Sequence, residues 1–167
     1  MKPKIRYAWG QSSLGAFIAA TSRHGLLMVE FDKPEGSLVA ALGERFPEAC
    51  VDEDSVFMTR IVQELVELIE QPHSASLLAV DLHGSDFQRR VWHALRAIPA
   101  GETVCYGNIA AQLGVPKEAR EVASACAANT LAVLIPCHRV VKKDGSISGY
   151  RWGVQRKRAL LAREARA

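Results

Sequence analysis

Closely spaced cysteines, long apolar runs and low-complexity tracts are all missing from this chain of 167 residues. No C-x-x-C pair or other zinc spacing occurs among its four cysteines, Cys50, Cys105, Cys126 and Cys137. No stretch reaches the roughly 18 apolar residues that a membrane span needs. These absences argue against a zinc-held fold, a disulfide framework and a membrane-spanning helix. We expect a cytoplasmic protein with reduced thiols that uses no metal and no cofactor.

Charge is distributed unevenly along the chain. Residues 1–83 hold seven Lys and Arg against twelve Asp and Glu, whereas residues 84–167 hold fourteen against six, giving net charges of −5 and +8. With 49% hydrophobic residues the chain can bury a core, and its length allows one domain or two small ones. The charge asymmetry favours two, residues 1–80 and 84–167. The basic one is the candidate for binding a polyanion.

The first half of the chain predicts a small unit of strands and helix. Three short apolar segments within residues 5–31 are separated by Gly15 and by residues 22–25, a pattern typical of an antiparallel meander. Residues 61–70 then repeat apolar side chains at helical spacing, with glutamates on the opposite side. This amphipathic helix should pack on the sheet, and residues 71–84 should lead to the second unit.

The second half predicts mainly helices. Ser85-x-x-Gln88 is a capping box that opens the first of them. Residues 108–113 and 117–128 flank a turn with Gly114, and they form a candidate helix-turn-helix. Small side chains crowd the second of these helices: Ala119, Ala123, Ser124, Ala125, Ala127 and Ala128. They allow close approach, either to a neighbouring helix or to the backbone of a nucleic acid.

Cysteine and histidine stand side by side after the apolar run 131–135, in the sequence Pro136-Cys137-His138-Arg139. A thiol among apolar side chains is normally inert, because burial raises its pKa and only the thiolate is a good nucleophile. An imidazole nearby can act as the base that activates it. If the apolar run is a strand, neighbouring side chains point to opposite faces. Contact between the two groups then requires a turn or a bridging water.

These segments resemble those of the O6-alkylguanine-DNA alkyltransferases, repair proteins that move an alkyl group from guanine O6 onto their own cysteine. The similarity runs almost without gaps over residues 85–164, including the glycine-containing loop 145–153, whereas the first 80 residues match only loosely. The resemblance implies an α/β fold, with a small ribonuclease H-like N-terminal domain built on a three-stranded antiparallel sheet. A mainly helical, winged helix-turn-helix-like C-terminal domain would follow it.

The resemblance also assigns chemical roles. Cys137 would accept the alkyl group in one irreversible displacement, and nothing in the sequence would regenerate the thiol. Its proton would pass through water to His138, which Glu164 would orient. Asn129 would hydrogen-bond near the thiol. Tyr106 would donate to the departing base.

The partner implied by the resemblance is double-stranded DNA containing O6-alkylguanine, bound by a monomer. Activity on O4-alkylthymine and cooperative binding of several copies along DNA are left open. The small-residue helix would enter the minor groove through Ala119, Ala123, Ser124 and Ala127. The alkylated nucleotide would be flipped out of the stack, and the planar guanidinium of Arg120 would take its place.

One wall of the base pocket would be formed by Val140, Tyr150, Arg151 and Trp152. Tyr150 is suited to covering the face of a flat base. Some members of the family have serine and glycine in place of Arg151 and Trp152. We expect the large indole of Trp152 to narrow the rim, and therefore good activity on O6-methylguanine and poor acceptance of benzyl-sized adducts.

Two other functions fit some of these residues. A lesion-sensing DNA-binding regulator without transferase activity would explain the helix-turn-helix, but it leaves Cys137 and His138 without a task. A Cys-His hydrolase would use both groups, but it predicts repeated turnover and does not explain the charge of +8 in residues 84–167. Replacing Cys137 by alanine would leave a regulator unchanged, whereas it would inactivate an alkyltransferase or a hydrolase.

Overall fold

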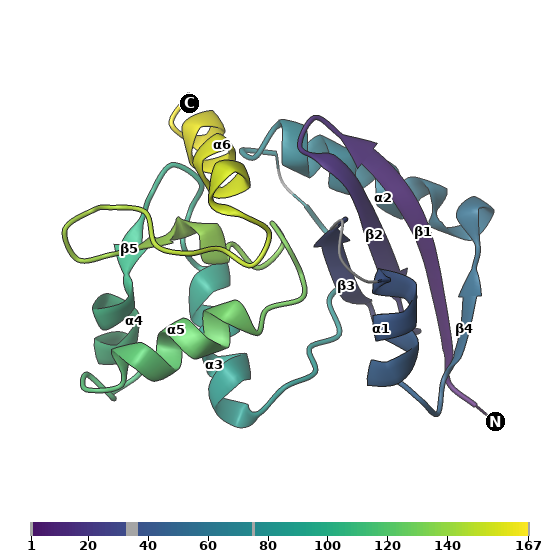
Figure 1. The fold of residues 1–167 in the computed structure, drawn as a ribbon, viewed down its shortest axis with the longest axis horizontal. Helices are drawn as coiled ribbons and strands as arrows, with labels where there is room; N and C mark the ends of the chain where they lie inside the picture. The colour runs from purple at the N-terminus through teal and green to yellow at the C-terminus, as the bar shows by residue number, and fades with distance from the viewer. Residues whose placement is uncertain (1, 33–36, 75, 167) are drawn as a thin grey trace. The chain divides into compact units, whose positions relative to one another are not determined.

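The computed structural model describes residues 2–32, 37–74 and 76–166. The chain forms two compact units, Met1–Leu82 and His83–Ala167 (Figure 1). Among the described residues, no helix has the length and apolar character required to cross a membrane.

A four-stranded sheet in the order β3-β2-β1-β4 is the base of the first unit. The antiparallel meander expected from the sequence is confirmed as β1 (Lys4–Ser12), β2 (Gly15–Thr21) and β3 (Leu26–Phe31). A fourth strand, β4 (Cys50–Glu53), pairs in parallel with β1 at the edge. The expected count of three strands missed it, because four partly polar residues show no readable alternation.

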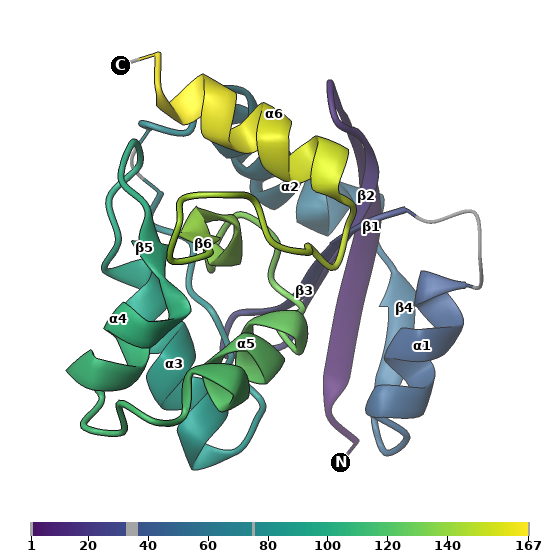
Figure 2. The ribbon, with the colours of Figure 1, turned by 60° about the vertical axis from the view of Figure 1, so that its left-hand side comes forward.

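Helices cover both faces of this sheet (Figure 2). α1 (Leu38–Arg45) buries Leu42 in an apolar cluster with side chains of β1, β2 and β3. α2 (Ser55–Glu70), the amphipathic helix that the sequence predicts, covers the other face. Space on that face is tight, because a Cβ atom added to Gly10 would lie 2.5 Å from the Phe17 ring. Because both faces are covered, β2 and β3 are buried along most of their length.

The second unit begins with α3 (Asp86–Arg96), and its capping box is confirmed. The backbone N–H of Gln88 donates to Ser85 Oγ at 3.1 Å, and that of Ser85 donates to Gln88 Oε1 at 3.0 Å. The buried Trp92 fixes this helix to the next layer, because its Nε1–H donates to the Ala125 carbonyl at 2.9 Å.

The helix-turn-helix is present as α4 (Tyr106–Gln112) and α5 (Ala119–Ala127). Its turn contains Gly114 with φ of 80°, a left-handed conformation that favours glycine. α4 begins two residues earlier than predicted, directly after β5 (Val104–Cys105). β5 pairs in parallel with β6 (Val140–Val141), so Tyr106 is held close to the chain that follows Cys137 and His138.

The apolar run 131–135 is not the strand that the sequence predicted. It folds into successive turns, in which the Leu134 N–H donates to the Ala132 carbonyl at 2.8 Å and the Ile135 N–H donates to the Leu131 carbonyl at 3.0 Å. Val133 has φ of 69°, which a β-branched residue rarely adopts. The reason for the turn lies in Asn129, whose hydrogen bonds are described below.

Candidate active site

The short 3-10 helix η1 (Cys137–Arg139) carries the thiol and the imidazole. It starts where the Cys137 N–H donates to the Ile135 carbonyl at 2.8 Å, and it closes with a bond from the Arg139 N–H to the Pro136 carbonyl at 2.9 Å. Of the two possibilities that the sequence left open, a turn is therefore present at this point. Cys137 is 5% exposed and His138 is fully buried.

Asn129 holds the turns in front of Cys137 in place. Its Nδ2 donates to the Ile135 carbonyl at 2.9 Å and to Cys137 Sγ at 3.4 Å, and its Oδ1 accepts from the Leu131 N–H at 2.9 Å. One buried amide thus fixes both ends of the apolar run and also touches the sulfur. Such a fully bonded amide offsets the strain of Val133.

Glu164 lies at the end of α6 (Val154–Glu164) and is 1% exposed. Its Oε2 lies 2.5 Å from His138 Nε2, and Arg139 binds both carboxylate oxygens, through Nε at 2.9 Å and Nη2 at 3.1 Å. Burial alone would raise the pKa of Glu164, but the hydrogen bonds from His138 and Arg139 outweigh it and lower this pKa to about 2. The carboxylate is therefore ionised at neutral pH.

His138 is a neutral base held in one orientation. Burial lowers its pKa below the ordinary value, although the hydrogen bond and the charge of Glu164 act in the opposite direction. Because an ionised carboxylate only accepts hydrogen bonds, Nε2 must carry the proton, which leaves the lone pair on Nδ1. Nδ1 is buried and has no protein partner among the described residues. This nitrogen is the atom that can take a proton.

The Cys137 thiol is protonated in the resting protein. Burial raises its pKa above the ordinary value, and the hydrogen bond from Asn129 and the charge of Lys157 only partly counteract this. Cys126 is the other buried cysteine nearby, and burial raises its pKa to about 12. Of the two, only Cys137 lies beside an amide donor and a possible base.

Lys157 is a buried cation that the sequence analysis missed. It is fully buried, and its Nζ donates to the Val140 carbonyl at 2.7 Å and to Ser148 Oγ at 3.0 Å. Ser148 Oγ lies 2.6 Å from the Tyr106 hydroxyl. Burial raises the pKa of Tyr106 above its ordinary value, so its hydroxyl stays protonated at neutral pH. Ammonium, serine and tyrosine therefore form one polar chain.

A cavity of about 460 Å³ joins these groups. It is lined by Tyr106, Ala123, Cys126, Ala127, Cys137 and residues 148–151. This volume falls in the range typical of sites for small molecules. The cavity is large enough for a nucleobase, and the sulfur lies on its wall.

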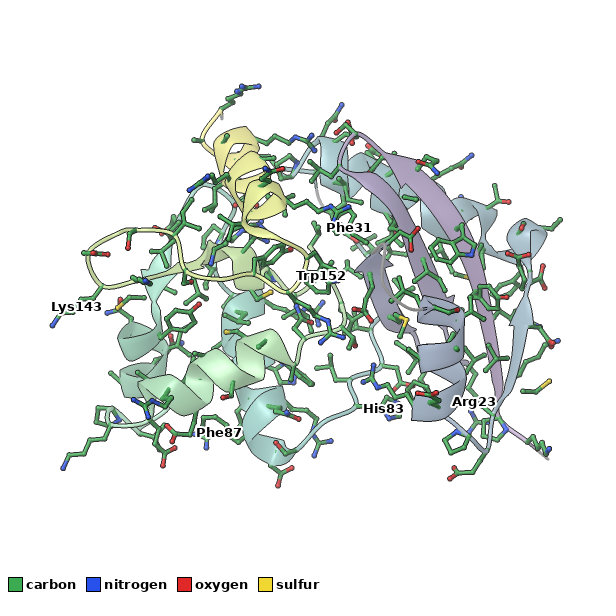
Figure 3. All side chains as sticks on the ribbon, viewed as in Figure 1. Arg23, Phe31, His83, Phe87, Lys143 and Trp152 are labelled. Carbon is green, nitrogen blue, oxygen red and sulfur yellow. The ribbon has the colours of Figure 1, made fainter. Side chains whose placement is uncertain are left out.

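Two of the four residues predicted to line the pocket wall do not line this cavity. Val140 is fully buried and contributes only its carbonyl to Lys157. Trp152, which precedes the first turn of α6 (Figure 3), is 2% exposed and packs edge-to-face with the Tyr150 ring, with centroids 5.2 Å apart. Its indole is buried and does not line this cavity, and the expected effect of Trp152 on adduct size stays a prediction. Trp152 supports Tyr150, which lines the cavity with Arg151.

The residues predicted to meet DNA share the outer side of α5. Its inner side buries Val122, Ala125 and Cys126. The outer side carries exposed or half-buried side chains, namely Ala119, Arg120, Ala123, Ser124 and Ala127. Because Ala123 and Ala127 also line the cavity, this outer side leads directly to its mouth.

Comparison with known proteins agrees with this geometry. A family model described as the DNA-binding domain of 6-O-methylguanine DNA methyltransferase matches residues 86–166. The crystal structure of the Mycobacterium tuberculosis O6-methylguanine methyltransferase has a TM-score of 0.81 to this chain at 34% identity, covering 96% of this chain and 93% of that one. The chain belongs to the O6-methylguanine DNA methyltransferase family.

Further relatives in this family extend the match. The same M. tuberculosis protein in complex with DNA has a TM-score of 0.80 at 33% identity, over 97% of this chain and 92% of that one. The Escherichia coli bifunctional transcriptional activator/DNA repair enzyme Ada is 44% identical over 161 residues, which are 96% of this chain and 46% of Ada. The chain spans about half the length of the curated relatives that it matches.

Lys157 and Glu164 lie on the buried side of α6 although both are charged. In α6 the buried positions are Lys157, Leu160 and Glu164, spaced like an apolar stripe of a helix. A charged residue at such a position needs a buried partner.

No three His, Cys, Asp or Glu side chains cluster as metal ligands within residues 2–32, 37–74 and 76–166.

Proposed function

We propose that this protein repairs double-stranded DNA by transferring an alkyl group from guanine O6 to its own Cys137, once per molecule. One observation carries the proposal above all others. A buried thiol lines a cavity the size of a nucleobase, with a neutral imidazole beside it that is clamped by an ionised carboxylate. Membership of the methyltransferase family supports it further.

The base side of the reaction starts at His138. Its Nδ1 takes the thiol proton, directly or through one water, and Glu164 and Arg139 stabilise the imidazolium that forms. The sulfur then attacks the alkyl carbon, so that the S–C bond forms as the O6–C bond breaks. The electron pair of that bond moves onto the guanine. The product is a thioether, which no other group in the cavity can displace.

The acid side of the reaction is the polar chain of Lys157, Ser148 and Tyr106. Lys157 donates to Ser148, which leaves the serine hydroxyl proton for the Tyr106 oxygen. Tyr106 can then donate its own proton to the departing base, so that guanine leaves as a neutral molecule. The imidazolium of His138 then loses its proton to solvent and Tyr106 regains one from solvent, so that overall one proton passes from the thiol to the guanine. The positive charge of Lys157 favours both the thiolate and the electron-rich base.

DNA reaches the cavity through the outer side of α5. We assign the minor-groove contact to the small residues Ala119, Ala123, Ser124 and Ala127, and the stacking role in the vacated helix to Arg120. The net charge of +8 in residues 84–167 supplies the attraction to phosphates. The M. tuberculosis relative in complex with DNA supports this assignment. We further propose that the protein acts as a monomer in the cytoplasm.

The test is a single-turnover assay with a duplex containing radiolabelled O6-methylguanine. We expect a burst of labelled protein equal to the protein added, and one methyl thioether on Cys137 by peptide mass. Cys137→Ala should remove the label. Cys50→Ala, an exposed cysteine in the first unit, serves as the matched control and should retain it.

Three outcomes would overturn the proposal. Label on another residue would show that Cys137 is not the acceptor. Repeated turnover would favour a hydrolase. Binding of the damaged duplex with no label transferred by the unmodified protein would leave only a regulator. A duplex with O4-methylthymine, run in parallel, decides whether that base is also a substrate.

A further inference from the structure

Two buried polar atoms on neighbouring rings have no protein partner in the part of the chain that the structure describes. They are Nδ1 of His138 and the hydroxyl oxygen of Tyr150. The two rings meet edge to face, with centroids 6.4 Å apart and an interplanar angle of 82°. Because nearly all buried polar groups in folded proteins are hydrogen-bonded, two such atoms at one place indicate a partner that they share.

The ring of Tyr150 is fixed in its place against the imidazole. It packs edge-to-face with the buried indole of Trp152, with centroids 5.2 Å apart. The Tyr150 carbonyl accepts from the Gly153 N–H at 3.1 Å, and the carbonyl of Gly149 accepts from Lys157 Nζ at 3.5 Å. These contacts hold the backbone and the ring from several sides, so the hydroxyl has a defined position.

The two atoms have complementary needs. Nδ1 of His138 accepts, because Nε2 carries the proton that is shared with Glu164. The Tyr150 hydroxyl donates, since burial raises its pKa well above the ordinary value and keeps it protonated. They form no hydrogen bond with each other, so they are separated by more than one bond length. A single water can accept from the phenol and donate to the imidazole.

We propose that Tyr150 is a positioning residue for the ionisation of Cys137, in which its hydroxyl and His138 Nδ1 hold one water that also accepts the thiol proton. This inference rests on the transferase function proposed above and deepens it by adding a side chain to the activation step. Cys137 directly precedes His138 in η1, and three hydrogen bonds are the usual number for a buried water.

The proton moves through this water without a net change in it. The S–H bond breaks as the thiol proton passes to the water, and the water gives one of its own protons to Nδ1. The thiolate and the imidazolium are then present, and the water donates to the sulfur. A water that accepts from a phenol is a stronger donor, because linked hydrogen bonds polarise one another. The Tyr150 hydroxyl therefore favours the thiolate over the thiol.

Other groups around the water act on the same equilibrium. Lys157 and Arg151 favour the thiolate, and Glu164 favours the imidazolium. All of them remain when Tyr150 is replaced by phenylalanine, so this substitution removes the hydroxyl alone. The remaining titratable groups that act on the thiol, the imidazole or the phenol, or that the thiol acts on, are Tyr106 of α4, Cys126 of α5, Arg139 of η1 and Arg156 of α6.

The experiment measures methyl transfer from the free base O6-methylguanine, so that DNA binding does not enter. Single-turnover rate constants are measured across the pH range in which thiols ionise. In Tyr150→Phe we expect transfer at neutral pH to slow by about tenfold, as for one lost hydrogen bond near a developing charge. The pH profile should move upward, because the thiolate loses support. The difference should shrink at high pH, where the thiol ionises in both proteins.

Tyr7→Phe is the matched control, because Tyr7 lies in β1 of the first unit and does not line the cavity. It should change neither the rate nor the profile. A crystal structure of the unmodified protein is the second readout. It should show a water within hydrogen-bond distance of the Tyr150 hydroxyl, His138 Nδ1 and Cys137 Sγ.

Three results would overturn this inference alone, with methyl transfer by the unmodified protein intact. They are an unchanged rate in Tyr150→Phe, an equal slowing at every pH, which indicates packing only, and a crystal structure in which the hydroxyl binds elsewhere. Absence of transfer from O6-methylguanine by the unmodified protein, both as the free base and in duplex DNA, would overturn the proposed function itself. The two failures are therefore distinguishable.

Discussion

Glu164 is the residue that pairs with Arg139 and orients the neutral imidazole of His138. Its pKa of about 2 lies below the ordinary value of 4.5, so the folded state favours the ionised form. A carboxyl group whose pKa is lowered by folding adds stability that is fully present above its unfolded pKa. This contribution is lost as the pH falls through the folded pKa. The group therefore acts on stability between about pH 4.5 and pH 2.

We predict that Glu164→Gln lowers the free energy of unfolding by about 3 kcal/mol at neutral pH, because Arg139 loses its charged partner in a buried place. Below about pH 4.5 the difference from the unmodified protein should shrink. Urea denaturation at a series of pH values measures both effects. A difference that stays constant down to pH 2 would contradict the assignment.

Lys157 gives a second prediction at this scale. In Lys157→Met the chain through Ser148 to Tyr106 loses its cation, and the thiol loses a positive neighbour. We expect methyl transfer to slow by about tenfold and its pH profile to shift upward, because the thiol pKa rises further. DNA affinity, measured by fluorescence anisotropy, should not change. A slower rate with an unshifted profile would indicate that Lys157 is only structural.

At the scale of elements, α5 separates binding from chemistry. Ser124 is exposed on its outer side and does not line the cavity. We predict that Ser124→Glu slows transfer from duplex DNA by about tenfold or more, because a carboxylate would face phosphates. Transfer from the free base O6-methylguanine should not change. Gln155→Glu, an exposed position on α6, is the control with the same charge change. Equal slowing of both substrates by Ser124→Glu would place this residue in the cavity chemistry instead.

Elements with local signals could be predicted from the sequence. The capping box at Ser85, the meander and the two helices around Gly114 depend on neighbours within a few residues, and all are present. The turns of 131–135 could not be predicted, because an apolar run reads as a strand unless the bonds of Asn129 are known.

Side-chain positions that depend on packing could not be predicted from the sequence either. Trp152 was expected at the pocket rim, but it lies in the core beneath Tyr150. From the sequence, Lys157 looked like one more exposed cation of a basic helix. Only the fold shows that it is buried beside Val140 and Ser148. Sequence spacing predicts which residues share an element, whereas their contacts with distant segments follow from the fold.

For the whole molecule, the charge asymmetry predicts how DNA binding responds to salt. Residues 84–167 carry +8 and residues 1–83 carry −5. Contacts to phosphates release counterions, so we expect affinity for undamaged duplex to fall by more than about tenfold between about 50 and 200 mM salt. Anisotropy titrations at several salt concentrations measure the slope. A flat dependence would mean that the basic unit does not bind the backbone.

The neutral state of Cys137 matters for the proposed transfer, in which each molecule works only once. A permanently ionised thiol would react with peroxides and with free alkylating agents in the cell, and each such encounter would remove one copy before it met a lesion. Burial at 5% exposure, together with a raised pKa, keeps the sulfur unreactive in the resting protein. The same burial that makes the thiol a poor nucleophile in isolation thus preserves its capacity until a damaged base fills the cavity.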